Sequence, residues 1–160
     1  MVENVLVAVH QTLMTMFKKY ILPLLSIFLF SACAKKTESA APAITFKSIS
    51  PSSLQIGKDN FTITFSYADS DGDLGENAAD VKNMFVTDKR NGVVYQFRIP
   101  QLSPTGATIS IQGDLNIDMP NVGITDGETS ESVTFDVYVK DRAGNQSNTI
   151  TSTAATVTAP

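Results

Sequence analysis

Residues 61–67 read FTITFSY, with an apolar side chain at every odd position from Phe61 to Tyr67 and a small hydroxyl side chain at every even one. A period of two is typical of a strand that buries one face. No window of the chain shows a helical period, so the sequence predicts an all-β domain. The same alternation, or a shorter form of it, gives seven candidate strands: 44–49, 61–67, 84–88, 93–99, 109–117, 133–139 and 148–157.

Turn residues separate these candidate strands. Asn91-Gly92 stands between the third and the fourth, and this pair is the strongest short hairpin signal that a sequence carries. Gly113 indicates either a bulge or a split in the fifth strand, and the irregular last strand also indicates a bulge. Seven short strands with polar turns favour an antiparallel sandwich of the immunoglobulin-like kind over residues 44–160, with an open barrel as the alternative.

The segment upstream of this domain has the layout of a bacterial lipoprotein signal. Two lysines precede an apolar run from Tyr20 to Ala32, and Cys33, the one cysteine of the chain, follows two small residues. Spanning a bilayer takes about 20 apolar residues. The run is shorter than that and contains Pro23, so it is typical of a cleaved signal. We expect residues 1–32 to be removed and Cys33 to carry the lipid.

Met16 makes a better start for this signal than Met1, because the two lysines after it supply the short basic region that signals prefer. Residues 1–15 are then a mis-assigned start. Beyond the cysteine the chain is small, polar and without periodicity, which predicts a flexible tether. The expected division is a signal segment at 1–32, the lipidated cysteine and tether at 33–43, and the β domain at 44–160.

Composition excludes several functions. The chain has 12 basic and 16 acidic residues, and removing Lys18, Lys19 and Glu3 with the signal leaves 10 and 15. No basic cluster marks a face for nucleic acid. The one histidine, His10, is also removed, which excludes serine–histidine and cysteine–histidine nucleophiles and zinc sites built on His and Cys. Only oxygen ligands remain for a metal, which favours calcium or another hard cation.

One loop offers such ligands. Asp69, Asp71 and Asp73 occupy alternate positions directly after the strand at 61–67, and they resemble the start of a DxDxDG calcium loop. Asp80 falls where the twelfth-position ligand of such a loop would stand. Leu74 replaces the glycine of the sixth position, with a glycine on either side. Two interpretations remain open: a calcium site, and a solvated acidic turn in which Asp and Gly serve loop geometry.

A second loop, DRAGNQSN at 141–148, follows the strand at 133–139. In an immunoglobulin-like sandwich the two loops emerge at the same end of the domain. We therefore expect Asp141 to lie near the acidic loop and count it as a fifth candidate metal ligand. The other interpretation is an ordinary hairpin turn, with Arg142 pairing to an acidic neighbour.

In this arrangement residues 16–160 resemble the small single-domain lipoproteins of Bacteroidota-type bacteria, which carry a lipidated cysteine, a short tether and an immunoglobulin-like domain. The resemblance rests on this arrangement and on the loops DSDGDLG and DRAGNQSN. It implies a cell-envelope protein held by a lipid anchor. Surface-exposed members carry acidic residues soon after the cysteine, whereas Lys35 and Lys36 follow here, so the resemblance implies an outer-membrane anchor that faces the periplasm.

Two functions fit these observations. The first is a monomeric, non-enzymatic binding or scaffolding module for a protein or glycan partner, stabilised by calcium if the acidic loop binds it. The alternative is an enzyme, or an enzyme accessory, that acts on envelope polysaccharide through carboxylates such as Asp69, Asp71, Asp73 and Glu76. The first is favoured, because a fold alone supports no activity and the usual catalytic side chains are missing.

Overall fold

The computed structural model describes residues 40–160, which are all β and contain no helix. The expected signal segment, Cys33 and most of the tether lie outside the described residues. Within the described part, no helix is long and apolar enough to cross a membrane. The strands are β1 (Ala43–Ser50), β2 (Ser53–Gln55), β3 (Phe61–Asp69), β4 (Met84–Asp88), β5 (Val94–Phe97), β6 (Ile111–Met119), β7 (Ser130–Val133), β8 (Phe135–Val139), β9 (Ile150–Thr151) and β10 (Ala155–Thr158).

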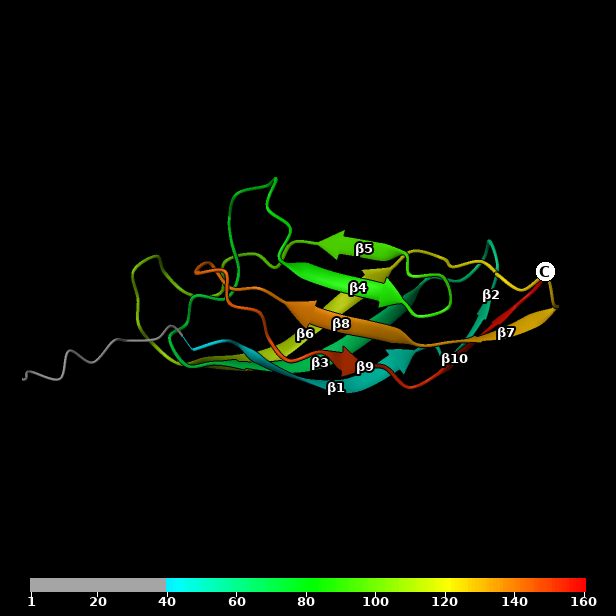
Figure 1. The fold of residues 1–160 in the computed structure, drawn as a ribbon, viewed down its shortest axis with the longest axis horizontal. Coiled ribbons are helices and arrows are strands. Elements are labelled where there is room, and N and C mark those ends of the chain that lie inside the picture. The colour runs from blue at the N-terminus through cyan, green and yellow to red at the C-terminus, as the bar shows by residue number, and fades with distance from the viewer. Residues whose placement is uncertain (1–39) are drawn as a thin grey trace, which may run out of the picture. The chain divides into compact units, whose positions relative to one another are not determined.

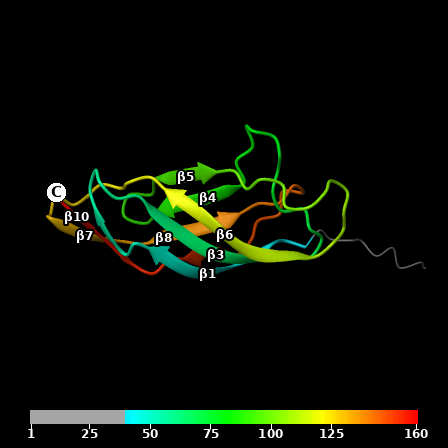
Figure 2. The same cartoon turned by 180° about the vertical axis from the view of Figure 1, so that it is seen from behind.

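These strands form three sheets, with the orders β1-β3-β6, β5-β4-β8-β9 and β2-β10-β7. The sheet β1-β3-β6 lies behind β4 and β8 in Figure 1 and in front of them in Figure 2, so the first two sheets face each other as layers. All pairings are antiparallel except that of β2 with β10, which is parallel. The third sheet lies at the end of the domain that carries the C-terminus (Figure 1).

The all-β prediction is confirmed, but the described residues form ten strands where seven were expected. The expected strand 133–139 belongs to a longer run that breaks at Thr134, where the chain passes from β7, paired with β10, to β8, paired with β4 and β9. The expected strand 148–157 also breaks, into β9 and β10. The short strand β2 was not expected.

A serine side chain explains the second break. Ser152 lies between β9 and β10, and its hydroxyl accepts a hydrogen bond from the Phe135 N–H at 3.0 Å while its own N–H donates to the Phe135 carbonyl. Ser147 meets the other end of β8 in the same way, through the N–H and carbonyl of Val139. Each serine hydroxyl serves as the acceptor for a buried backbone N–H at one end of β8. The ends of β8 therefore stay hydrogen-bonded where the neighbouring strand is no longer regular.

The core fills the space between the two facing layers. Phe61, Ile63 and Phe65 of β3 are buried, as the alternation predicts, and the Phe61 ring lies 5.3 Å from the Phe135 ring of β8. Leu74, which lies in a loop, is also fully buried. Burying side chains of this size contributes about 1.5 to 3 kcal/mol each, so this face of β3 fixes the register of its sheet.

The turn predictions have mixed outcomes. Asn91-Gly92 closes a β4–β5 hairpin, with Gly92 at φ 74° and the Asp88 N–H donating to the Val93 carbonyl, so that prediction is confirmed. Gly113 marks neither a bulge nor a split, since it pairs with Tyr67 inside a continuous β6. The close approach of the Tyr67 ring, 3.2 Å from where a Cβ would stand, accounts for that glycine. A register shift occurs instead in β1, between Phe46 and Ser48.

The strand directions determine where the acidic loop lies in the domain. β1 begins at Ala43, one residue earlier than expected, and Ala43 pairs with Ala68, the residue before Asp69. The chain therefore enters the domain beside the acidic loop. The loops that follow β3, β5 and β8 gather at this end, whereas the C-terminus lies at the opposite end (Figure 1).

Candidate functional site

The acidic loop is built around Asp69, the last residue of β3. Asp69 is only 1% exposed, and its Oδ2 accepts a hydrogen bond from the Leu74 N–H at 2.8 Å. Leu74 in turn inserts into the core and bridges to Asp141 of the second loop. The residue that departs from the calcium-loop pattern therefore anchors the loop to the domain.

Two glycines give this loop its tight path. Gly72 and Gly75 have φ values of 74° and 91°, in the left-handed region that favours glycine. A Cβ at Gly72 would overlap the carbonyl oxygen of Ile109, and one at Gly75 would overlap that of Pro100. The segment after β5 therefore backs the acidic loop, and Ser103 fixes it further by donating its hydroxyl to the Gly72 carbonyl.

The second loop lies against the first, as expected from the strand order. The backbone N–H of Arg142 donates to the Asp73 carbonyl at 3.2 Å, and its guanidinium donates to the carbonyls of Gly75 and Gly72 at 2.8 and 3.4 Å. The Ala143 N–H donates to Asp73 Oδ2 at 3.2 Å. The sequence predicts that Arg142 pairs with an acidic neighbour, whereas these guanidinium hydrogen bonds go to backbone carbonyls. They join two segments about 70 residues apart in sequence.

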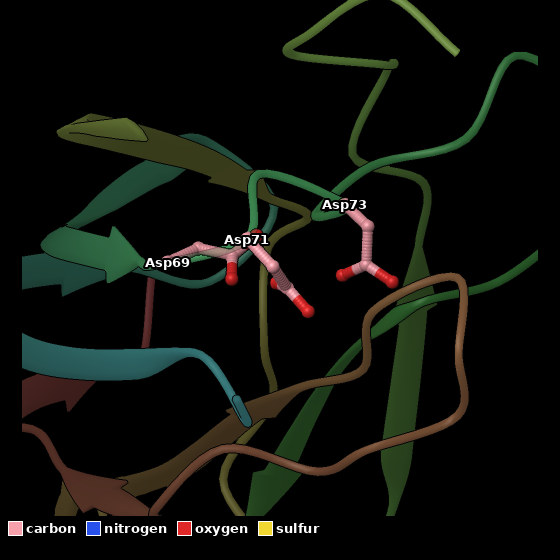
Figure 3. Close-up of side chains that lie close together, drawn as sticks. All are labelled: Asp69, Asp71 and Asp73. Carbon is pink, nitrogen blue, oxygen red and sulfur yellow. The ribbon is translucent and has the colours of Figure 1, made fainter. Parts of the chain in front are cut away.

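Three carboxylates meet between these loops. One oxygen each of Asp69, Asp71 and Asp73 lies within 4.8 Å of the others, and Figure 3 shows the three side chains on one side of the loop. The Oδ1 atoms of Asp69 and Asp73 are buried and have no hydrogen-bond partner. Buried polar atoms are nearly always paired, so two such atoms in one loop call for an explanation.

The electrostatics of the group disfavour its fully ionised form. Burial, more than the neighbouring Asp71 and Asp73, raises the pKa of Asp69 to about 6, although the Leu74 N–H opposes the shift. Burial also raises the pKa of Asp73, followed by the negative charges of Asp141 and Asp71, with the Ala143 N–H and Arg142 acting in the other direction. The loop thus concentrates negative charge that the surrounding protein only partly compensates.

The other two predicted ligands are placed differently. Asp141 is buried nearby, but its two oxygens accept from the backbone N–H and the side-chain amide of Asn145, at 2.7 and 2.9 Å. Its carboxylate therefore shapes its own turn. Asp80 is exposed, and the metal-like group found within residues 40–160 consists of Asp69, Asp71 and Asp73 without it.

A second feature was missed by sequence reasoning. Phe85 of β4 and Tyr138 of β8 are opposite each other in register, and their rings stack at 4.8 Å and 12° on the face of the sheet that points away from the core. Lys140 Nζ lies 5.6 Å from the Phe85 ring centroid. Both rings follow from the alternation of their strands, since Tyr138 lies between the buried Val137 and Val139 and Phe85 lies between the buried Met84 and Val86.

Two shallow hollows lie on the described surface. One is on the outer face of β1-β3-β6 and is lined by Ala43, Thr45, Ser66, Tyr67, Ala68, Gln112, Gly113 and Asp114. The other is lined by Asn77, Gln101, Leu102, Ser103 and Pro104. Neither hollow is lined by a carboxylate of the acidic group.

Comparison with known proteins gives little. No family model and no curated protein matches the chain. Among solved structures, a mutant of the SrpA adhesin from Streptococcus sanguinis is similar at 20% identity and a TM-score of 0.39. The alignment covers 78% of this chain and 60% of the adhesin chain, so this chain spans less than two thirds of that protein.

Proposed function

We propose that this chain is a membrane-anchored, non-enzymatic cell-envelope lipoprotein whose immunoglobulin-like sandwich serves as a binding or scaffolding module. The observation that carries the binding role is the Phe85–Tyr138 stack, because aromatic side chains on the outer face of a sheet are typical anchors of interfaces. A nearby Lys140 adds a positive charge to this otherwise uncharged pair.

The strand order supports the immunoglobulin-like assignment. With β1 and β2, β7 and β8, and β9 and β10 each counted as one interrupted strand, the sheets have the orders A-B-E and C′-C-F-G. This is the arrangement of an immunoglobulin-like sandwich without a D strand. The parallel pairing of β2 with β10 then joins the end of the first strand to the last.

The lipid anchor is supported by the signal pattern that ends at Cys33. We propose an anchor in the outer membrane, facing the periplasm, as Lys35 and Lys36 suggest. In cells that express the whole chain, Cys33→Ser should move the protein from the membrane to the soluble fraction or leave it unprocessed. Equal membrane partitioning of the mutant and the unmutated protein would contradict the anchor.

The binding role is testable by site-specific crosslinking in the same cells. A photo-reactive amino acid placed at Tyr138 should give a discrete crosslinked species, and Phe85→Ala should weaken it because half of the aromatic pair is lost. The matched control is the same amino acid at Asp118, on the outer face of the opposite sheet. Equal crosslinking from both positions would count against a binding face at Tyr138.

The polysaccharide-cleaving alternative has less support. That chemistry needs a pair of carboxylates facing a substrate cleft. Glu76 accepts hydrogen bonds from the N–H groups of Asn77 and Ala78, at 2.7 and 3.2 Å, and so serves its own loop. A binding module requires no such cleft.

A further inference from the structure

The acidic loop contains an arrangement that the fold itself does not require. Asp69 is almost fully buried, and only its Oδ2 has a role in folding, as the acceptor for the Leu74 N–H. Its Oδ1 is buried without a hydrogen-bond partner, and a carboxylate oxygen of Asp69 lies within 4.8 Å of one oxygen each of Asp71 and Asp73. An orphaned carboxylate oxygen that faces two further carboxylates is the arrangement expected around a cation.

The charges around the acidic loop also favour a bound cation. Three aspartates share the loop, Asp141 lies beside them, and two basic side chains, Arg142 and Arg98, donate to backbone carbonyls of the loop. Arg142 donates to the carbonyls of Gly72 and Gly75. Since burying uncompensated charge is costly, a cation with more than one positive charge would relieve most of the repulsion.

The ligand chemistry selects the ion. The group offers only carboxylate oxygens, which hard cations prefer, and the loop supplies no nitrogen or sulfur side chain for zinc or copper. Calcium accepts six to eight oxygens in flexible geometry, whereas magnesium demands a near-ideal octahedron. A single loop with three carboxylates, completed by water or backbone oxygens, fits calcium better than magnesium.

We propose that one carboxylate oxygen each from Asp69, Asp71 and Asp73 binds a single calcium ion, which stiffens the loop after β3 beside its contacts with the loop after β8. Asp73 is the connecting ligand, because its backbone carbonyl and its Oδ2 are already held by Arg142 and Ala143 of the second loop. Asp141 and Asp80 are not ligands. The site stands independently of the proposed function; only its position near the membrane rests on the lipid anchor.

The affinity should be that of an extracellular module, with a Kd of about 0.1 to 1 mM, since only three side chains supply charge. The test uses the full chain purified in a non-ionic detergent. Calorimetric titration should show one calcium per chain, and 5 mM calcium should raise the unfolding midpoint by about 3 to 10 °C over the chelated protein. No binding and no shift at 5 mM calcium would overturn the proposal.

Variants separate this site from general ionic effects. Asp71→Asn with Asp73→Asn should abolish the calcium response while leaving the chelated midpoint equal or higher, because like charges have been removed. Asp80→Asn is the matched control, and it should keep the full response. If the double variant fails to fold, Asp71→Asn alone should weaken the calcium affinity at least tenfold.

A calcium response that survives in the double variant, or one lost in Asp80→Asn, would refute the ligand set. The Cys33→Ser protein should bind calcium like the unmutated chain. Failure of the anchor and failure of the metal site are therefore distinguishable.

Discussion

A single residue, Leu74, anchors the acidic loop to the core of the domain. Where a DxDxDG loop would place its glycine, this chain has a fully buried leucine whose N–H holds Asp69. The conformational freedom moves to Gly72 and Gly75 on either side. The acidic loop is consequently anchored to the core at its centre.

Gly75 should tolerate no side chain. Gly75→Ala combines left-handed strain, about 1 to 2 kcal/mol, with overlap on the Pro100 carbonyl, so we expect it to lower the free energy of unfolding by more than about 3 kcal/mol. Gly57→Ala is the matched control, because Gly57 has φ 74° but nothing within 4 Å of a Cβ. It should cost only the strain. Urea unfolding in the presence of a chelator measures the free energy of unfolding of both variants. Equal losses would show that the Pro100 carbonyl moves away from the added methyl group at little cost.

At the scale of elements, side chains decide where strands break and how hairpins are held. The β4–β5 hairpin is tied to β7 by Arg90, whose guanidinium contacts Asp88 at 2.6 Å and Glu131 at 3.0 Å. The Asp88 side chain is 1% exposed. Glu131 also accepts from the backbone and hydroxyl of Thr125, and these bonds, ahead of the charge of Arg90, lower its pKa.

Arg90→Ala should therefore be costly. It leaves the buried Asp88 carboxylate without its guanidinium and with the backbone N–H of residue 90, and losing one member of a buried pair lowers the free energy of unfolding by about 3 to 5 kcal/mol. Lys47→Ala provides the comparison, since Lys47 and Asp114 form an exposed pair and should contribute at most about 1 kcal/mol. Chemical denaturation distinguishes the two. Similar small losses would mean that Asp88 finds other partners.

The hydroxyl of Ser152 should be as important to β8 as a ladder hydrogen bond. Ser152→Ala removes the acceptor of the buried Phe135 N–H, which should cost about 1 to 3 kcal/mol. Thr153→Ala changes an exposed neighbour and should have little effect. Hydrogen exchange of the Phe135 amide is the direct measurement. Unchanged protection in Ser152→Ala would contradict the role given to the hydroxyl.

These cases show what the sequence could and could not predict. The alternation at 61–67 and the Asn91-Gly92 turn identified β3 and the β4–β5 hairpin, because both signals are local. The breaks at Thr134 and Ser152 depend on which sheet each half joins, which is not a local property. Asp80 was proposed as a ligand from the spacing of a DxDxDG calcium loop, whereas in this loop the buried Leu74 donates its N–H to Asp69. The hydrogen bond from Asn145 to Asp141 could not be predicted from the spacing of the acidic residues.

On the scale of the whole molecule, the described residues 40–160 form one compact unit. Its first strand, β1, contributes Ile44 and Ile49 to the core and pairs with β3 along its length. Asn148 fixes the start of that strand by hydrogen bonds to both the N–H and the carbonyl of Ile44, each at 2.8 Å. The domain therefore includes everything from β1 onward.

A fragment of residues 38–160 should fold without the upstream segment. We expect a β-type circular-dichroism spectrum, a monomer in sedimentation and a single cooperative unfolding transition, because the apolar core described above lies within these residues. A fragment of residues 51–160 lacks β1 and should not fold cooperatively, since β3 would lose its partner and the core two isoleucines. Cooperative unfolding of the shorter fragment would contradict this account of β1.

The parallel pairing of β2 with β10 has a mechanical consequence. The chain enters the domain at one end and finishes at the other (Figure 1), so a pull between its two ends draws β2 and β10 in opposite directions along their length. Parallel strands drawn apart in this way slide past each other, and their hydrogen bonds bear the load together instead of opening one after another. A module tethered at one end and held by a partner at the other would resist such tension as a shear clamp.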